Sequence, residues 1–450
     1  MPLSRELNSR IARFFELEAR GSTVATEARG AVATFLTMAY ILFANPSILA
    51  AAGVPFESAV AATAVSAAVC SILMGVVANA PIALAAGMGL NAIIAFHVAP
   101  AAGSWQTAMG LVVLDGLIVV ALVLLGLRAA VMHAIPRDLR RAIGVGIGLF
   151  IAFIGAVNAK LVVVPAGTVT ALARGGEGVF PPVTYGSLRA PETAIALIGV
   201  IVIAYLLTRG VRGAIVLGIL VGAVLALLFG VASPPPGSWL AVPSFDTIGQ
   251  ADVVDALRLS VLPLVVPLVM VDFFDTIGTV TAVSEEAKQM DEHGKVPRLK
   301  RILLVDGVSA SLGGVAGASS VTSYVESAAG VAEGARTGLH SVFVGLLFAL
   351  AIFAAPIAGI VPAAATAPAL IVVGFLMVQQ IGRIDFRSLD SALPAFVLLT
   401  TIPFTYSISH GIGFGFITYV AVKILGGHFR DVHPLMYGSA TLFAAYFIWS

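Results

Sequence analysis

Three acidic side chains lie in stretches of the chain that are otherwise apolar. Asp272 and Asp275 stand three residues apart in Val-Asp-Phe-Phe-Asp-Thr-Ile-Gly-Thr, so in a helix they share a face with Thr276 and Thr279. Glu326 lies in a second such stretch. A carboxylate buried among apolar groups is unstable unless it is paired or protonated, and it can therefore hold a proton near neutral pH. Such a group could couple proton movement to substrate movement, with both binding on one side and leaving on the other.

Further acidic residues occur in similar surroundings. Asp115 and Asp306 lie in Leu-Asp-Gly and Val-Asp-Gly contexts, and for both we favour helix capping or a hydrogen bond between helices over a transport role. Glu333 lies near the end of its apolar stretch and is predicted to reach the membrane interface. The interiors of the stretches that carry Asp275 and Glu326 contain no Lys or Arg. These two carboxylates therefore need a proton, a cation or a substrate rich in hydrogen-bond donors.

The composition places these acids in a membrane. Of the 450 residues, 59% are hydrophobic and 11% are charged, and the mean hydropathy is +1.02. No Asp, Glu, Lys or Arg occurs in residues 58–114, 213–245, 337–382 or 391–422. Because one crossing of a bilayer needs about 20 apolar residues, each of these runs is long enough for at least one span. The chain is predicted to be an all-α polytopic membrane protein.

Several function classes are excluded on the same grounds. A net charge of +1 without a basic, aromatic-rich stripe argues against nucleic acid as a partner. Cys70 is the only cysteine, and the 7 His residues show no metal-ligand spacing, so neither disulfides nor a metal site are expected. We find no ATP-binding loop, no nucleophile–base arrangement and no cleaved signal peptide in residues 1–29. We therefore expect no cofactor and no enzymatic activity.

Apolar stretches with Gly, Pro or charged punctuation predict about fourteen spans. They run over 30–52, 57–79, 81–99, 104–127, 140–158, 193–208, 212–232, 258–284, 299–316, 318–333, 337–360, 363–381, 388–408 and 410–427. A final stretch, 434–449, is short for a span and would lie along the membrane or pack on the bundle. With a cytoplasmic N-terminus, the Lys and Arg residues after spans 4, 6, 8, 12 and 14 all fall on the cytoplasmic side, and loops 233–250 and 356–364 carry none. This asymmetry is the one that the positive-inside rule predicts.

Two of these spans do not resemble ordinary transmembrane helices. Residues 81–99 and 317–334, spans 3 and 10, each begin with a Gly-rich or extended part and become helical near a polar residue, Asn91 or Glu326. Paired interrupted spans in the two halves of a chain are typical of a transporter binding site. For residues 81–99 alone, close helix packing by small residues explains the glycines equally well. A weak similarity between segments beginning at Gly213 and Gly411, seven spans apart, favours two seven-span repeats of opposite topology.

Four motifs make the chain similar to a known family. Thr34-Phe-Leu-Thr-Met-Ala-Tyr-Ile with Asn45-Pro46, Gly87-Met-Gly-Leu-Asn-Ala, the segment 271–279 and Ser319-Ser-Val-Thr-Ser-Tyr-Val-Glu-Ser-Ala-Ala-Gly-Val resemble the adenine/guanine/hypoxanthine permeases. These are a branch of the nucleobase–cation symporters within the xanthine/uracil permease superfamily, and the resemblance runs from about residue 12 to about residue 445.

The resemblance implies an architecture. It implies 7+7 inverted repeats, with short strands and half-helices in spans 3 and 10, and a core domain that moves like an elevator against a gate domain. The implied division is a cytoplasmic segment 1–28, core 29–127 (spans 1–4), gate 128–235 (spans 5–7), core 250–360 (spans 8–11), gate 361–430 (spans 12–14) and a C-terminal segment 431–450. It also implies a homodimer in a bacterial inner membrane.

The resemblance also implies a site and an activity, namely proton symport of purine nucleobases. Carried over by motif, the two carboxylates are Asp275 and Glu326, and either could hold the coupled proton. The other substrate-binding candidates are Asn91, Thr279, Ala39, Tyr324 and Phe274. Some uracil carriers have His at the position of Thr279, so a proton role of that His does not transfer. Phe273, Phe274 or Tyr324 could stack on the base, although aromatic residues in spans more often serve packing.

A purine base suits two carboxylates because one carboxylate can accept two parallel N–H bonds from its edge. Backbone N–H groups at the start of the span-10 half-helix could donate to a ring nitrogen or carbonyl of the base. The alternatives are a carrier of the same architecture for a pyrimidine, xanthine or an anion, or a channel. Two carboxylates with no fixed cation argue against an anionic substrate.

Overall fold

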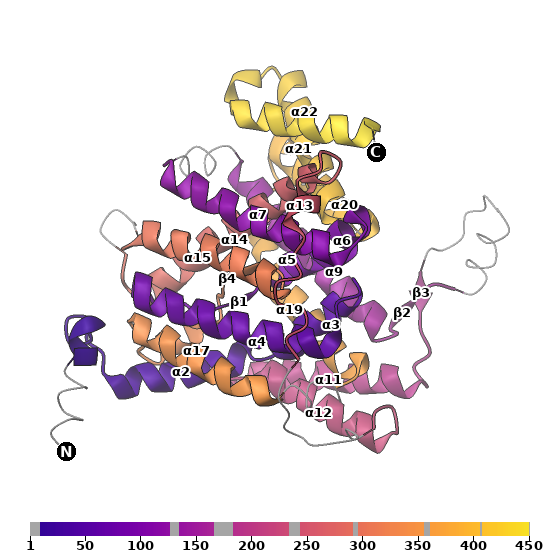
Figure 1. The fold of residues 1–450 in the computed structure, drawn as a ribbon. Helices are drawn as coiled ribbons and strands as arrows, with labels where there is room; N and C mark the ends of the chain where they lie inside the picture. Colours follow the sequence, from indigo (N-terminus) through magenta and orange to yellow (C-terminus); the bar gives the residue numbers. More distant parts are fainter. Residues whose placement is uncertain are drawn as a thin grey trace, which may run out of the picture.

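The computed structural model describes residues 10–126, 135–165, 183–233, 244–290, 296–354, 361–405 and 407–449. The molecule is built almost entirely of helices, many of which run in roughly the same direction or its reverse (Figure 1). The first half of the chain contains α2 (Val24–Met38), α3 (Ile41–Ala50), α4 (Phe56–Leu73), β1 (Leu84–Ala86), α5 (Met88–Ile93), α6 (Ala99–Ala102), α7 (Trp105–Leu124), α9 (Arg137–Asn158), β2 (Val162–Val163), β3 (Thr184–Tyr185), α11 (Pro191–Thr208) and α12 (Ala214–Leu228). π-Helical turns over Met74–Ala78 and Ile94–Val98 extend α4 and α5.

The second half contains α13 (Val253–Ala256), α14 (Val265–Glu286), α15 (Leu299–Ala316), β4 (Val321–Ser323), α16 (Ser327–Ala332), α17 (Gly338–Ala351), α19 (Ala363–Val378), α20 (Leu389–Thr405), α21 (Ile408–Leu425) and α22 (Pro434–Trp449), with short 3-10 helices over Leu262–Leu264, Ile352–Ala354, Gln379–Arg383 and Phe429–Asp431. The last helix, α22, packs on α21. The C-terminal stretch for which the sequence left two placements open therefore packs on the bundle.

The prediction of a multi-pass membrane protein is confirmed. Seven helical stretches within the described residues are long and apolar enough to cross a membrane: Val24–Ala50, Phe56–Ala78, Trp105–Leu124, Arg137–Asn158, Pro191–Thr208, Leu262–Glu286 and Ala363–Arg383. Shorter apolar helices cover Met88–Ala102, Ala214–Leu228, Gly338–Ala351, Leu389–Thr405 and His410–Leu425. Each of the fourteen predicted spans coincides with a helix or with a strand–helix unit, and the exact number of crossings stays a prediction.

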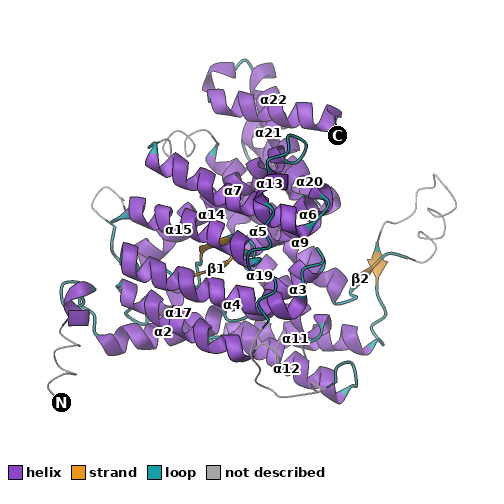
Figure 2. Ribbon diagram, viewed as in Figure 1, coloured by secondary structure: helices purple, strands orange, loops and turns teal. Residues whose placement is uncertain are grey.

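Spans 3 and 10 are interrupted, as the resemblance implied. β1 and β4 pair antiparallel near the middle of the molecule (Figure 2), with Leu84 opposite Ser323 and Ala86 opposite Val321. Backbone bonds from Gly87 N to Ser320 O and from Tyr324 N to Ala83 O, both 2.9 Å, continue the ladder at its two ends. Each strand thus satisfies polar backbone groups of the other, which is the condition for non-helical backbone at membrane depth. Close packing by glycine alone does not explain the composition of residues 81–99.

The contacts between helices of the two halves follow a regular pattern. α2 packs on α16 and α17, and in the same manner α14 packs on α5 and α7. α4 packs on α17 and β1, and α15 packs on α7 and β4. α9 and α19 pack on each other, and they pair with α20 and α11 respectively. In these pairs, replacing a helix by its counterpart seven spans away gives the corresponding contact in the other half.

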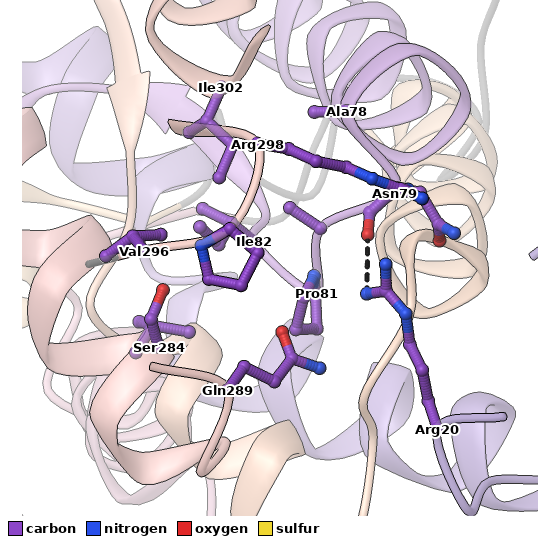
Figure 3. A pocket seen from close by; sticks show the side chains of 13 residues that line it. Arg20, Ala78, Asn79, Pro81, Ile82, Ser284, Gln289, Val296, Arg298 and Ile302 are labelled. Atoms are coloured by element: carbon purple, nitrogen blue, oxygen red, sulfur yellow. Dashed lines mark hydrogen bonds between the residues drawn. The ribbon is translucent and has the colours of Figure 1, made fainter. Parts of the chain in front are cut away.

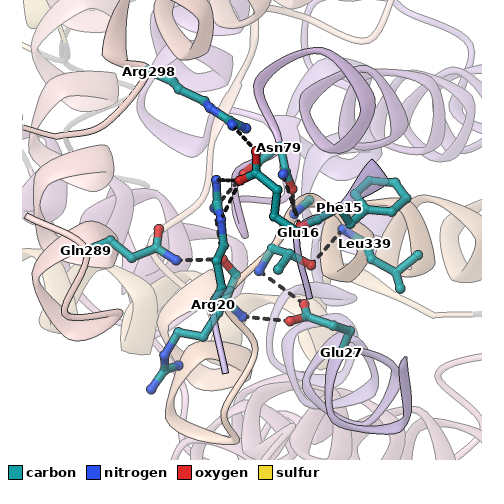
Figure 4. Close-up of polar contacts among 11 residues, drawn as sticks. Phe15, Glu16, Arg20, Glu27, Asn79, Gln289, Arg298 and Leu339 are labelled. Atoms are coloured by element: carbon teal, nitrogen blue, oxygen red, sulfur yellow. Dashed lines mark hydrogen bonds and ion pairs between the residues drawn. The ribbon is translucent and has the colours of Figure 1, made fainter. Parts of the chain in front are cut away.

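The segment before α2 is attached to the ends of later spans through Glu16, Arg20 and Asn79 (Figure 4). Arg298 donates to Glu16 at 2.6 Å and Arg20 donates to the Asn79 carbonyl at 3.0 Å, while Asn79 Nδ2 donates to Phe15 O at 3.1 Å. The Arg298 guanidinium beside Glu16 holds the pKa of that carboxyl below its usual range. These bonds attach residues 10–21 to the chain before β1 and to the start of α15.

A small pocket lies at the same place (Figure 3). Asn79 and Ile82 line it from the chain before β1, Ser284 from the end of α14, and Arg20 and Arg298 from the attached segment and the start of α15. None of the predicted substrate-binding residues lines this pocket. It belongs to the attachment of the N-terminal segment and not to the candidate site.

Candidate functional site

The site is built where the strand pair, α14 and the break in span 1 meet. Glu326 directly precedes α16, three residues after β4 ends, and Asp275 lies in the middle of α14. The charge of Asp275 interacts with that of Glu326, and both act on the phenol groups of Tyr40 and Tyr324. The structure therefore brings together Asp275, Glu326 and Tyr324 from the predicted set, and adds Tyr40 to them.

Tyr40 is the residue that sequence reasoning missed. Span 1 is broken: α2 ends at Met38 and α3 begins at Ile41, with Ala39 and Tyr40 between them. The Tyr40 hydroxyl donates to Glu326 Oε1 at 2.9 Å, and its side chain is 1% exposed. Tyr40 belongs to the Thr34–Ile41 motif of the resemblance, so the motif marked the position, but nothing local indicates that its ring reaches span 10.

The other predicted residues surround this centre in different ways. Tyr324 donates its hydroxyl to the Ala86 carbonyl at 2.5 Å, so it ties the chain directly after β4 to β1. Asn91, on α5, is fully buried, and neither of its amide atoms has a hydrogen-bond partner within the described residues. Thr279, one helical turn beyond Asp275, is also buried, and so is Ala39, which precedes Tyr40 in the chain. The side chain of Phe274 lies outside the described part of the structure, and Phe273 is buried in the core.

One face of α14 is accessible from Asp275 to the end of the helix. Asp275, Gly278, Thr281, Ala282 and Glu285 are exposed, at the spacing of a single helix face, whereas residues 271–273 before Asp275 are buried. The exposed residues are acidic, small or hydroxylated, and none is a large apolar residue of the kind that faces lipid. The face is thus suited to water, and it leads from Asp275 toward the C-terminal end of α14.

Asp306 makes hydrogen bonds between elements, as the sequence favoured for it. Its carboxylate accepts hydrogen bonds from Ser323 N at 2.9 Å, from Ser323 Oγ at 2.7 Å and from Thr276 Oγ1 at 2.5 Å. It therefore joins α15 to β4 and to α14. Glu333 forms ion pairs with Arg29, at 3.2 Å, and with Arg212, and so joins the end of α16 to the chain before α12.

Tyr40→Phe should weaken uptake without changing the fold. The variant keeps the buried ring and removes the hydrogen bond to Glu326, leaving that carboxylate with one fewer donor. A hydrogen bond to a charged group contributes about 1.5–3 kcal/mol, so we expect the KM for substrate to rise by at least about tenfold. Initial-rate uptake into proteoliposomes measures the change. Tyr185→Phe, at an exposed position, is the control, and an unchanged KM in Tyr40→Phe would show that the bond does not orient Glu326.

A family model described as the permease family, that of the xanthine and uracil permeases, matches residues 26–414. The chain belongs to this family. The prediction drawn from the four motifs is thereby confirmed, and with it the expectation that the chain is a transporter and not an enzyme. The match includes the break in span 1, both strand–helix units and α14, so every element that builds the candidate site lies within it.

Curated relatives match almost the whole permease. The chain is 40% identical over 448 residues to the guanine/hypoxanthine permease PbuG of Bacillus subtilis, covering 97% of this chain and 99% of that one. It is 38% identical over 440 residues to the adenine permease AdeP of Escherichia coli, covering 96% and 95%. Among solved structures, the transmembrane domain of the cyanobacterial bicarbonate transporter BicA aligns with a TM-score of 0.64 at 19% identity, covering 87% of this chain and 96% of that one. At that identity the likeness shows the fold alone.

Proposed function

We propose that this permease imports purine nucleobases such as hypoxanthine, guanine or adenine by proton symport. The observation that carries the proposal is the meeting of Asp275 and Glu326, from two different spans, at a point where a third span is also broken. The helical segments around them contain no Lys or Arg in their interiors. Two acids without a fixed cation suit a neutral substrate that presents N–H groups, and they disfavour an anion such as bicarbonate.

The edge of a purine base fits this pair. One carboxylate can accept two parallel N–H bonds, such as N1–H and the 2-amino group of guanine, and this fixes the orientation of the base. Glu326, held by Tyr40 at 2.9 Å, is suited to that role, and Asp275 approaches from the other side. One of the two also carries the coupled proton. The names of PbuG and AdeP, one a guanine/hypoxanthine and the other an adenine permease, support a purine as substrate.

The architecture supports alternating access by an elevator movement. The regular exchange of packing partners between the halves is the pattern expected of 7+7 inverted repeats. In this proposal spans 1–4 and 8–11 form the moving core, and spans 5–7 and 12–14 form the gate and the homodimer contact. With the N-terminus in the cytoplasm of a bacterial inner membrane, the accessible face of α14 corresponds to a site open to the inside.

The test is uptake of radiolabelled hypoxanthine, guanine and adenine by purified protein in proteoliposomes, with and without an inward proton gradient. Saturable uptake that the gradient drives uphill is the expected result. Uptake that ignores the gradient would remove proton symport from the proposal. Failure of all purines, with transport of a pyrimidine or an anion, would remove the purine assignment, and a current that does not saturate would indicate a channel.

A further inference from the structure

A second group of carboxylates lies away from the accessible face of α14. Asp115 on α7, Asp272 on α14 and Asp306 on α15 are each at most 1% exposed. Asp275, one turn along α14 from Asp272, is exposed. The three buried acids, which we call the acid cluster, therefore differ from the substrate-facing pair in their access to water.

Two Asp-Gly dipeptides bring the cluster together. Gly116 and Gly307 follow Asp115 and Asp306, and α7 and α15 touch at these glycines. A Cβ on Gly307 would stand 3.2 Å from the Gly116 carbonyl oxygen, and a Cβ on Gly116 would overlap the backbone of Gly307. Contact of this closeness between two helices places the preceding carboxylates near each other, and their charges interact. The charge of Asp272 interacts with both.

The hydrogen bonding of the cluster is incomplete. Asp306 has its three donors, but within the described residues no hydrogen bond of ordinary length reaches either carboxylate oxygen of Asp115 or Asp272. The hydroxyls of Ser320 and Thr322 are close enough to influence these two carboxylates. Ser320 Oγ is itself fully buried and has no ordinary hydrogen bond in the described structure. Buried polar atoms are nearly always satisfied, so carboxyl groups with so few donors are more stable when one of them carries a proton.

The elements that carry the acid cluster supply acidic groups but no basic residue close to it. α7, α14 and β4 contain no Lys, Arg or His, and the two basic residues of α15, Lys300 and Arg301, lie more than one turn before Asp306. The remaining titratable groups that face the cluster are the Cys70 thiol from α4 and Asp275 from α14. Adjacent buried carboxylates cannot all be ionised at once without a cation between them, because their repulsion adds to the cost of desolvation. No group of three His, Cys, Asp or Glu side chains in the described ranges has the geometry of a metal site, which favours a proton.

We propose that Asp115, Asp272 and Asp306 form a second proton-binding site, separate from the substrate-facing pair, which takes up and releases a proton in the transport cycle. The proton bonds to one carboxylate oxygen and removes that group's repulsion of the other two carboxylates. It enters from external water past Asp275, three residues from Asp272, when the core faces outward, and it leaves past Asp275 to the internal water when the core faces inward. This inference rests on the proton coupling proposed above and adds residues to it that the substrate does not touch.

The test combines two measurements on proteoliposomes, hypoxanthine uptake as a function of external pH and the number of protons that enter per hypoxanthine, read with an internal pH-sensitive dye. Asp115→Asn and Asp272→Asn are compared with Asp385→Asn, an exposed acid on the chain before α20. We expect the midpoint of the pH profile to shift by about one pH unit or more in the two cluster variants, since interacting acids titrate together. The proton count per hypoxanthine should fall, and the control should match the wild type.

The outcomes are separable. Thermal-shift binding of hypoxanthine should persist in both cluster variants, because neither residue faces the substrate. A pH profile and a proton count equal to the wild type would overturn the proposal. A wild type that ignores the proton gradient would instead overturn the proton coupling on which it rests. Choline in place of sodium tests the other cation. If the wild type then loses uptake and the variants do not, the cluster binds a sodium ion and not a proton. Should an Asp→Asn variant not fold, Ser320→Ala perturbs the same site more mildly and carries the same expectation.

Discussion

Glu326→Gln should abolish purine uptake. The amide has nearly the shape of the carboxylate, but it is neutral and offers one acceptor oxygen where the carboxylate offers two. The base then loses a bidentate, charge-assisted pair of hydrogen bonds, each worth about 1.5–3 kcal/mol. We expect kcat/KM for hypoxanthine to fall by at least about 100-fold, which corresponds to ~2.7 kcal/mol. Initial rates of radiolabelled uptake, with the amount of folded protein checked by size-exclusion chromatography, measure the loss.

The matched control is Glu192→Gln. Glu192 makes a partly exposed ion pair with Lys160 at 2.9 Å, at the start of α11, and such pairs contribute little to stability. Its uptake should equal that of the wild type. Thermal shift with hypoxanthine separates binding from movement: the ligand should stabilise the wild type and the control but not Glu326→Gln. Ligand stabilisation that survives in Glu326→Gln would place the base elsewhere.

Asp275→Asn should have an effect of similar size, and Asp275→Glu should distinguish charge from geometry. Asp275 interacts electrostatically with Glu326 and is accessible along α14. The Asn variant removes a negative charge that both the substrate and the coupled proton use, and we expect uptake to fall by at least about 100-fold. The Glu variant keeps the charge but extends it by one methylene into a site shaped for the shorter side chain. We therefore expect a loss of about tenfold or more.

The control for this pair is Asp246→Asn, an acid in the chain before α13 that bonds to Ser244 outside the candidate site. Its uptake and pH dependence should match the wild type. Full activity in Asp275→Glu together with loss in Asp275→Asn would show that the charge alone matters. Full activity in Asp275→Asn would remove this residue from the site and leave Glu326 as the only carboxylate that binds the base.

Local sequence patterns were enough to predict that the chain is a membrane protein and which acidic residues lie in its spans. Long runs without charge, such as residues 58–114, can be stable only in lipid or in a large apolar core, so hydropathy indicates spans whatever the tertiary packing. The interruption of spans 3 and 10 was also readable, because glycine and polar residues inside an apolar run weaken a helix locally. The strand–helix units at residues 84–93 and 321–332 confirm that prediction.

The partners of these residues could not be predicted. Tyr40 donates to Glu326 across 286 residues, and Asp115 lies near Asp306 because two glycines let α7 and α15 touch. The sequence favoured one structural role for both Asp115 and Asp306, yet Asp306 has three donors while Asp115 has no ordinary hydrogen bond among the described residues.

The physical reason is how far along the chain the interacting residues lie from one another. Hydropathy, helix propensity and charge act through a residue's neighbours in the chain, so the sequence by itself determined the spans, their breaks and the acids they carry. Which acid faces water, which is buried with other acids and which tyrosine reaches a carboxylate depend on how helices far apart in the chain pack together. Only the tertiary structure decided that.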